Sequence, residues 1–211
     1  MQAPSEDAPT ADPTSVDLPR KRPKPGERRL QILQTLASML EQPGAERITT
    51  ASLAARMALS EAALYRHFVS KAQMFEGLID FIESSVLGLI QQILSREADG
   101  AVQAQRIVAV LLQFGERNPG MCRVMVGDAL AYEDERLTVR INQFFDKVES
   151  SLRQALRQAA DAAGSTTPTV TAQVQASVLV CFAMGRLQRY VRSAFRRLPT
   201  EQFDAAWQIL G

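Results

Sequence analysis

The sequence predicts an all-α protein, with a small helix-turn-helix domain followed by a larger helical domain. After residue 26, apolar residues recur every three or four positions almost throughout, and no convincing run alternates with the period of two typical of a half-buried strand. A third observation is residues 49–75, where two short apolar patterns carry one basic and aromatic face. We therefore expect a tail over residues 1–26, a helix-turn-helix domain over 27–71 and a second helical domain over 72–211.

Residues 1–26 are predicted to form a disordered tail with a basic end. They hold six of the ten prolines and few large apolar side chains, so they cannot bury enough surface to offset the entropy lost on ordering. The basic cluster in residues 20–24 is a candidate for following phosphates or entering a minor groove, as basic arms do. A tail that only solubilises the chain explains the same residues equally well.

An amphipathic helix is expected directly after the tail. Its apolar positions recur at helical spacing and would cover the helix-turn-helix that follows. These positions are Leu30, Leu33, Leu36, Ala37 and Leu40.

The second helix is predicted to begin at Thr49 or Thr50, because a threonine hydroxyl can accept a hydrogen bond from a free N–H of the first turn. Leu53, Ala54 and Met57 then fall on one face of this short helix, at i, i+1 and i+4 spacing. That face is expected to point inward.

The third helix follows a turn at residues 58–59 and has the features of a recognition helix. Ser60 is expected to cap it, and Leu64 and Phe68 point inward. Small outward residues would let the helix sit deep in a major groove, while larger polar ones reach bases or phosphates. The outward residues are Ser60, Glu61, Ala62, Ala63, Tyr65, Arg66 and His67. A helix-turn-helix also occurs as a plain packing unit, so this pattern alone favours DNA binding only weakly.

The distribution of charge strengthens the DNA-binding interpretation. Residues 20–71 hold ten basic and four acidic side chains, which gives this segment a charge of +6. The first 19 residues carry −4 and residues 72–211 carry −1, so the chain as a whole carries only +1. The near-neutral total hides a basic module around the predicted helix-turn-helix.

The rest of the chain is expected to be helical. Ser70 can cap a long helix that links the helix-turn-helix to the body, and the acidic residues 133–135 suit the first turn of a later helix. The long helix is expected to end near residue 95. Further helices are expected over residues 101–117, about 120–130, from after 132 to about 163, and over 169–195, and a last helix contains Trp207.

The segment 169–195 has a broad apolar surface, along which Val170, Val174, Val178 and Cys181 recur. A single core helix would explain it, but burial by a second copy is the more economical explanation. A twofold partner would bury this surface, so we expect a homodimer. Two recognition helices related by a dyad would read a palindromic site with half-sites about 34 Å apart. Five arginines between residues 186 and 197 form a second basic region, which is more typical of a solvated face than of a nucleic-acid contact.

The run LAARMALSEAALYRHFVSKAQMF at residues 53–75 resembles the N-terminal helix-turn-helix of TetR-type regulators. FGERNPGMCRVMVGDAL at 114–130 and RLTVRINQFFDKVESSLRQALRQ at 136–158 are similar to one branch of these proteins, the nucleoid occlusion factors. The resemblance implies a TetR-like fold with a three-helix N-terminal domain and a C-terminal helical dimerisation domain. It also implies binding to palindromic double-stranded DNA across the chromosome and, when so bound, to the division protein FtsZ, whose polymers are antagonised. Division is thereby kept off unsegregated DNA.

The same resemblance implies the residues of two sites. Thr49 and the N–H groups beside Lys71 suit phosphates, Ala62 and its neighbour suit thymine methyl groups, and Arg66 or its neighbour suits base edges or backbone. The implied DNA contacts are Thr49, Ser60, Ala62, Ala63, Tyr65, Arg66, His67 and Lys71.

The implied FtsZ-binding residues are Phe81, Val110 and Arg117. Phe81 and Val110 equally fit a core position, and Arg117 equally fits the end of a helix. The sequence departs from the family pattern at Leu89 and Gln113, where Arg and Gly are usual; these changes lie on the implied partner surface. Val69 stands where a proline is usual.

Other classes of function find little support in the sequence. The chain has one histidine, and it lacks a nucleophile motif, carboxylates paired at a recognisable spacing and a phosphate-binding glycine loop, so we expect no enzyme and no cofactor. Cys122 and Cys181 are far apart, which predicts buried free thiols rather than a metal site. A ligand-responsive transcriptional repressor of the same fold stays open, with an effector pocket in the C-terminal helices.

The expected location is the cytoplasm, in association with the nucleoid. No apolar run approaches the roughly 20 residues needed to span a bilayer, and the first 25 residues lack the apolar segment of a secretory signal.

Overall fold

Helix follows helix along the chain, as the sequence predicts. The computed structural model describes residues 26–42 and 47–210, and within them it contains α-helices, one short 3-10 helix and no strand. Of the expected tail over residues 1–26, residues 1–25 lie outside the described residues. The elements are α1 (Glu27–Leu40), α2 (Thr50–Arg56), α3 (Glu61–Tyr65), α4 (Lys71–Arg96), α5 (Gly100–Arg117), α6 (Pro119–Met125), η1 (Asp128–Leu130), α7 (Glu135–Ala162), α8 (Pro168–Arg192) and α9 (Phe203–Leu210).

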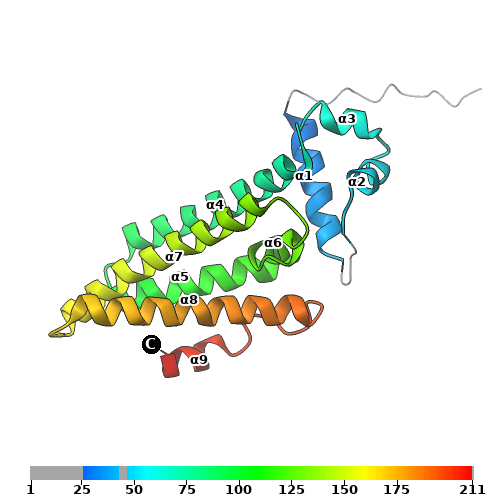
Figure 1. Cartoon of the computed structure of the whole chain (residues 1–211). Helices are drawn as coiled ribbons and strands as arrows, with labels where there is room; N and C mark the ends of the chain where they lie inside the picture. Colours follow the sequence, from blue (N-terminus) through cyan, green and yellow to red (C-terminus); the bar gives the residue numbers. More distant parts are fainter. Residues whose placement is uncertain (1–25, 43–46, 211) are drawn as a thin grey trace, which may run out of the picture.

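The long helices form an elongated bundle with the short helices at one end (Figure 1). Helices α4, α5, α7 and α8 pack along their lengths, with α7 against both α5 and α8. Helices α1 to α3 gather around the beginning of α4, and α9 lies alongside α8. Because α4 begins under the helix-turn-helix and continues through the bundle, it is the element common to both parts.

Helix α1 covers the helix-turn-helix with most of the face that was expected, because Leu33 and Ala37 pack against the core beside the buried Leu36 and Leu40. Ile32, Leu36 and Leu40 are buried, whereas the side chain of Leu30 is 56% exposed. Positions spaced by four share a face, and Leu30 lies about 200° around the helix from Ile32. The prediction of Leu30 as a core residue is therefore wrong.

Ion pairs fasten α4 to α7. The guanidinium of Arg140 on α7 pairs with both Asp80 and Glu83 of α4, and the Lys147 ammonium lies 2.9 Å from Glu83. Burial acts to raise the pKa of Glu83, but the hydrogen bonds from Lys147 and Arg140 outweigh it and hold this pKa below its ordinary value. The ionised Glu83 carboxylate therefore adds to the free energy of unfolding at pH values above its ordinary pKa. This contribution is lost as the pH falls through the lowered pKa of the folded protein.

Helices α4 and α8 are each long and apolar enough, by length and composition, to cross a membrane, with a mean hydropathy of 1.3 over an 18-residue window. The sequence expectation that no run approaches this length is corrected by that finding. Core helices of water-soluble bundles pass the same test. In α4, the carboxylates of Asp80 and Glu83 lie midway along the helix. In a membrane they would lie near the centre of the bilayer, where a charged side chain costs free energy.

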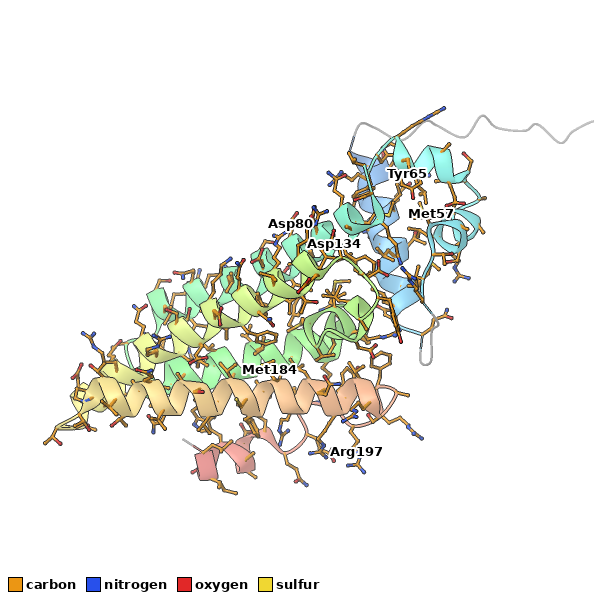
Figure 2. All side chains as sticks on the ribbon, viewed as in Figure 1. Met57, Tyr65, Asp80, Asp134, Met184 and Arg197 are labelled. Carbon is orange, nitrogen blue, oxygen red and sulfur yellow. The ribbon has the colours of Figure 1, made fainter. Side chains whose placement is uncertain are left out.

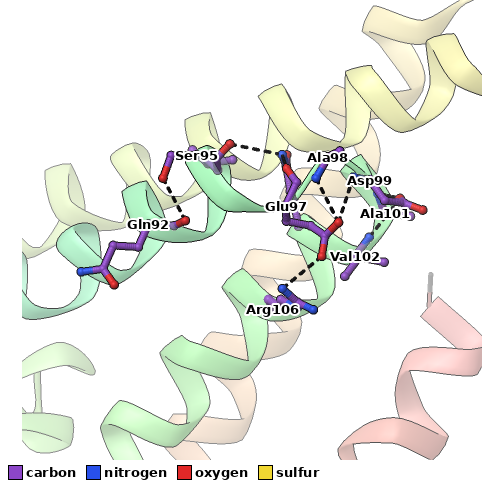
Figure 3. Close-up of polar contacts among 10 residues, drawn as sticks. Gln92, Ser95, Glu97, Ala98, Asp99, Ala101, Val102 and Arg106 are labelled. Carbon is purple, nitrogen blue, oxygen red and sulfur yellow. Dashed lines mark hydrogen bonds and ion pairs between the residues drawn. The ribbon is translucent and has the colours of Figure 1, made fainter.

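The carboxylates of Glu97 and Asp99 accept hydrogen bonds from backbone N–H groups where the chain turns from α4 into α5 (Figure 3). One carboxylate oxygen of Glu97 accepts from the N–H groups of Ala98 and Asp99, and the other lies 3.0 Å from Arg106. Asp99 then caps α5 by accepting from the N–H groups of its first turn. The break predicted at residues 99–100 is confirmed.

Three boundaries differ from the prediction. Helix α8 ends at Arg192 rather than near residue 195, because Ala194 and Phe195 adopt positive φ. Helix α6 ends at Met125 rather than near residue 130, because Gly127 adopts the left-handed conformation (φ 79°) and η1 follows it. Helix α7 begins at Glu135, after the cap Asp134. Glu133 therefore lies outside the first turn of α7, and its carboxylate serves a different purpose, described below.

Gly120 allows α6 to pack directly on the backbone of α1. A Cβ added at Gly120 would lie 2.3 Å from the Ala37 carbonyl oxygen, which is backbone and cannot swing away. We expect Gly120→Ala to lower the free energy of unfolding by about 1–3 kcal/mol through overpacking. Urea unfolding at a fixed protein concentration measures this.

Gly88→Ala is the matched control, because an added Cβ at this exposed α4 position meets nothing within 4 Å. It should raise the free energy of unfolding by about 0.5–1 kcal/mol through helix propensity. An unchanged stability of the Gly120 variant would contradict the close α1–α6 contact.

Candidate nucleic-acid interface

Helix α2 is fixed at its beginning by a reciprocal cap. The Thr49 hydroxyl accepts from the N–H of Ser52 at 3.0 Å, and the Ser52 hydroxyl accepts from the N–H of Thr49 at 3.0 Å. The sequence left Thr49 and Thr50 as alternatives, and Thr49 is the cap. Thr49 is exposed, and its hydroxyl hydrogen is not used in accepting, so it can still donate to a phosphate.

A hydrogen bond that could not be predicted from the sequence spans the turn between α2 and α3. Ala58 has a φ of 52°, the left-handed conformation that reverses the chain. The Thr50 hydroxyl donates to the Glu61 carboxylate at 2.6 Å, which ties the start of α2 to the start of α3. Glu61 was predicted only to complement the α3 dipole, and it also forms a hydrogen bond to α2.

Helix α3 presents the outward face that the sequence predicts. Ser60 caps it by accepting from the N–H of Ala63 at 3.2 Å, while Leu64 and Phe68 are fully buried beneath it. Tyr65 is 47% exposed and lies among the short N-terminal helices at one end of the molecule (Figure 2). The other exposed members are Ser60, Glu61, Ala62, Arg66 and His67, whereas Ala63 is half-buried.

Arg29 of α1 supports the end of α3, a role that sequence reasoning missed. Its guanidinium donates to the carbonyl oxygen of His67 at 2.8 Å and lies 4.0 Å from the centre of the Phe68 ring. Both contacts join residues 38 or more positions apart. The only signal available in the sequence was a basic residue in the helix that was expected to cover the motif.

Lys71 lies at the beginning of α4 but is not free. Its ammonium is 2.5 Å from the Glu133 carboxylate, whose side chain is only 8% exposed, and Arg47 approaches the same carboxylate at 3.8 Å. Of the eight implied DNA contacts, Lys71 is the one whose functional group already has a charged partner in the described structure. Glu133 thus links the helix-turn-helix to the segment before α7.

The three residues implied for FtsZ lie on neighbouring parts of α4 and α5. Val110 and Arg117 are seven positions apart and share a face of α5, and Phe114 between them has its ring 6.1 Å from that of Phe81. Phe81 is 50% exposed and borders a groove between α1 and α4, with a volume of about 280 Å³. Arg117 is exposed at the end of α5, next to Asn118 of the same groove, whereas Val110 is half-buried and packs against the core. We call this hollow the α1–α4 groove; Leu30, Leu33, Ala37, Phe81, Asn118 and Met121 are among its lining residues.

Helix α8 exposes an apolar stripe on the side away from the core. Val170, Val174, Val178 and Met184 are exposed large apolar side chains, and a Cβ added at Gly185 would meet nothing within 4 Å. These positions fall on one helical face. We call them the α8 stripe.

The two cysteines have different surroundings. Cys122 is buried, which raises the pKa of its thiol to about 12, whereas Cys181 is exposed on the face of α8 that carries the stripe. The prediction that both thiols are free is confirmed, and the prediction that both are buried is wrong for Cys181. Among the described residues, no three His, Cys, Asp or Glu side chains are grouped so that they could hold a metal ion.

Known proteins resemble the chain in both parts. Residues 32–78 match the family "Bacterial regulatory proteins, tetR family", and residues 98–211 match "Tetracyclin repressor-like, C-terminal domain". A solved structure of the fatty acid degradation regulator FadR from Bacillus halodurans has a TM-score of 0.73 at 13% identity, over 89% of this chain and 96% of that one. The TetR family regulator PfmR from Thermus thermophilus has a TM-score of 0.67 at 21% identity, over 85% and 93%. These structures confirm the TetR-like fold.

Relatives that are about half identical in sequence place the chain in one branch of this family. Nucleoid occlusion factor SlmA of Colwellia psychrerythraea is 50% identical over 195 residues, which cover 92% of this chain and 98% of the relative. The protein of the same name from Vibrio cholerae is 50% identical over 184 residues, which cover 87% and 93%. The chain therefore belongs to the family of the nucleoid occlusion factor SlmA, a branch of the DNA-binding TetR regulators.

Proposed function

We propose that this protein is a homodimer that binds palindromic sites on the chromosome and, when bound, binds FtsZ and antagonises its polymers over the nucleoid. The observation that carries the proposal is the exposed α3 face above a fully buried Leu64 and Phe68, in a chain of the SlmA family. A cytoplasmic, nucleoid-associated location follows from this function.

The DNA contacts are proposed in two groups. Tyr65, Arg66 and His67 extend from the exposed side of α3 toward bases or backbone, and the small residues Ala62 and Ala63 allow close approach to the groove. The hydroxyls of Thr49 and Ser60 face phosphates at the start of their helices. A phosphate at the beginning of α4 would compete with Glu133 for the Lys71 ammonium, so DNA binding would loosen that ion pair.

The α8 stripe is the proposed twofold interface. A run of exposed valines on a helix is costly in water, and a second copy of α8 crossing it would bury the same residues from both subunits. Gly185 on this face would let the two helix backbones approach closely. Dimerisation supplies the second recognition helix that a palindromic site requires.

Val174→Arg tests this interface. Val174 is 59% exposed in the single chain, and an arginine there would leave an unpaired charge buried in the dimer, so we expect predominantly monomers at micromolar concentration. Sedimentation equilibrium measures the change. Val139→Arg is the matched control, because Val139 is similarly exposed but lies on α7. A Val174 variant that stays dimeric would exclude the α8 stripe as the interface.

The α1–α4 groove is the proposed FtsZ-binding surface. Its lining is mainly apolar, it is bordered by the ring of Phe81 and it lies beside Arg117, so it suits a peptide segment with large apolar side chains and a nearby carboxylate. Leu89 extends the exposed apolar surface of α4 where the family usually carries Arg. Val110 is half-buried on α5 and does not line the groove, so it would contact FtsZ only where the partner extends beyond the groove.

Sedimentation of FtsZ polymers tests the proposed function. Purified FtsZ with GTP should yield less pelleted polymer in the presence of the protein and a palindromic duplex than with either alone. In Phe81→Ala, the loss of an exposed aromatic anchor should raise the effective concentration at least tenfold while DNA affinity stays unchanged.

Ile209→Ala is the control, since Ile209 is an exposed apolar residue on α9, outside the groove. If the polymer is unaffected by the DNA-bound protein, and a small ligand instead releases the DNA, the ligand-responsive repressor is the correct function.

A further inference from the structure

A hollow lined by arginines lies where α8 ends and the chain turns toward α9. Its volume is about 450 Å³, within the range of small-molecule sites. Its lining holds four guanidinium groups and a single carboxylate, which leaves a formal charge of +3. We call it the arginine hollow; its lining residues include Arg186, Arg189, Arg196, Arg197, Leu198 and Glu201.

The positive charge of the arginine hollow is not neutralised within the described chain. None of its four arginines forms an ion pair with a described carboxylate. Arg186 donates to the carbonyl oxygens of Pro199 and Glu201, and Arg196 donates to that of Ser193, so these two are held in place by backbone. Burial, and then the nearby charge of Arg189, lower the pKa of Arg186. The cations therefore repel one another across a site whose frame is fixed.

Two of the arginines remain available for a ligand. The guanidinium groups of Arg189 and Arg197 are exposed and make no hydrogen bond or ion pair to any described residue. Arg197 lies on the opposite side of the molecule from Tyr65 in Figure 2, so a duplex held by α3 does not explain this cluster. A solvated basic face, the interpretation favoured by sequence, explains neither the concave shape nor the backbone bonds that fix Arg186.

We propose that the arginine hollow binds a small polyphosphate, namely the triphosphate group of a nucleotide or an inorganic polyphosphate. Each guanidinium offers a planar pair of donors that matches phosphate oxygens, and several such forks suit adjoining phosphates better than a single one. A triphosphate carries three to four negative charges, which matches the hollow, whereas a lone carboxylate or phosphate would leave most of the cations unpaired. The proposal does not depend on FtsZ binding.

Isothermal titration calorimetry of the full chain tests this site, with sodium tripolyphosphate and ATP as separate probes at low salt. We expect saturable binding of one probe molecule per chain. The double variant Arg189→Gln/Arg197→Gln should weaken it at least tenfold, because two charge-assisted contacts are lost. Arg153→Gln is the control, an exposed arginine of α7 outside the hollow, and should change affinity less than twofold.

The two probes distinguish the source of the phosphates. Equal affinities support recognition of the phosphate chain alone, and tighter binding of ATP supports a nucleotide whose base also makes contact. Absence of saturable binding, or an equal loss in Arg153→Gln, would overturn the proposal. So would a double variant that weakens duplex DNA binding as strongly as it weakens tripolyphosphate binding, because the cluster would then belong to the DNA interface.

Discussion

The DNA-reading surface depends on the burial of Leu64 and Phe68 beneath it. Helices α2 and α3 have only seven and five residues, far fewer than the roughly 12 at which an isolated helix becomes even marginal in water. Packing on α1 and the start of α4 must therefore hold them, and the caps at Thr49 and Ser60 add about 1 kcal/mol each. The exposure of Tyr65 and Arg66 is a consequence, because their neighbours on the inner face are held in the core.

A second constraint joins this surface to the bundle. Lys71 and Arg47 both approach the carboxylate of Glu133, which is almost entirely removed from water. If one of the two cations is lost, the buried carboxylate depends on the other alone for its neutralisation. Gly120 brings α6 onto α1 from the same end. The position of the recognition helix and the shape of the α1–α4 groove therefore rest on shared elements, α1 and α4. This sharing gives a physical route by which bound DNA could alter a partner surface.

Local chemistry was readable from the sequence, and long-range contacts were not. Ser60 and Ser70 were predicted as caps because capping depends on the next three residues alone, and Leu64 and Phe68 were predicted as buried because they repeat at helical spacing. The pairing of Lys71 with Glu133 joins residues 62 apart, and no local pattern marks it. The same holds for Arg29, whose contact with His67 exists only once α1 crosses α3.

The face of a helix can also be misjudged from composition. Leu30 was expected in the core because it is apolar and near the start of a stripe, yet it borders the α1–α4 groove. Cys181 was expected inside for its chemistry, yet it is exposed on the face of α8 proposed for the dimer. In the sequence, an apolar residue that a partner would cover cannot be distinguished from one that the chain's own core covers. Only the packing of the helices separates the two. Resemblance supplied Phe81 as a partner contact, and Phe81 borders the α1–α4 groove.

The salt dependence of DNA binding tests the central claim most directly. The affinity for a palindromic duplex should fall linearly with salt on a log–log plot, and in Arg66→Gln the slope should shrink by about two per dimer, at roughly 0.9 per phosphate contact. Arg153→Gln, which removes an exposed arginine of α7, should leave the slope unchanged. A folded Arg66 variant that keeps the wild-type slope and affinity would contradict the assignment of α3 as the surface that meets DNA.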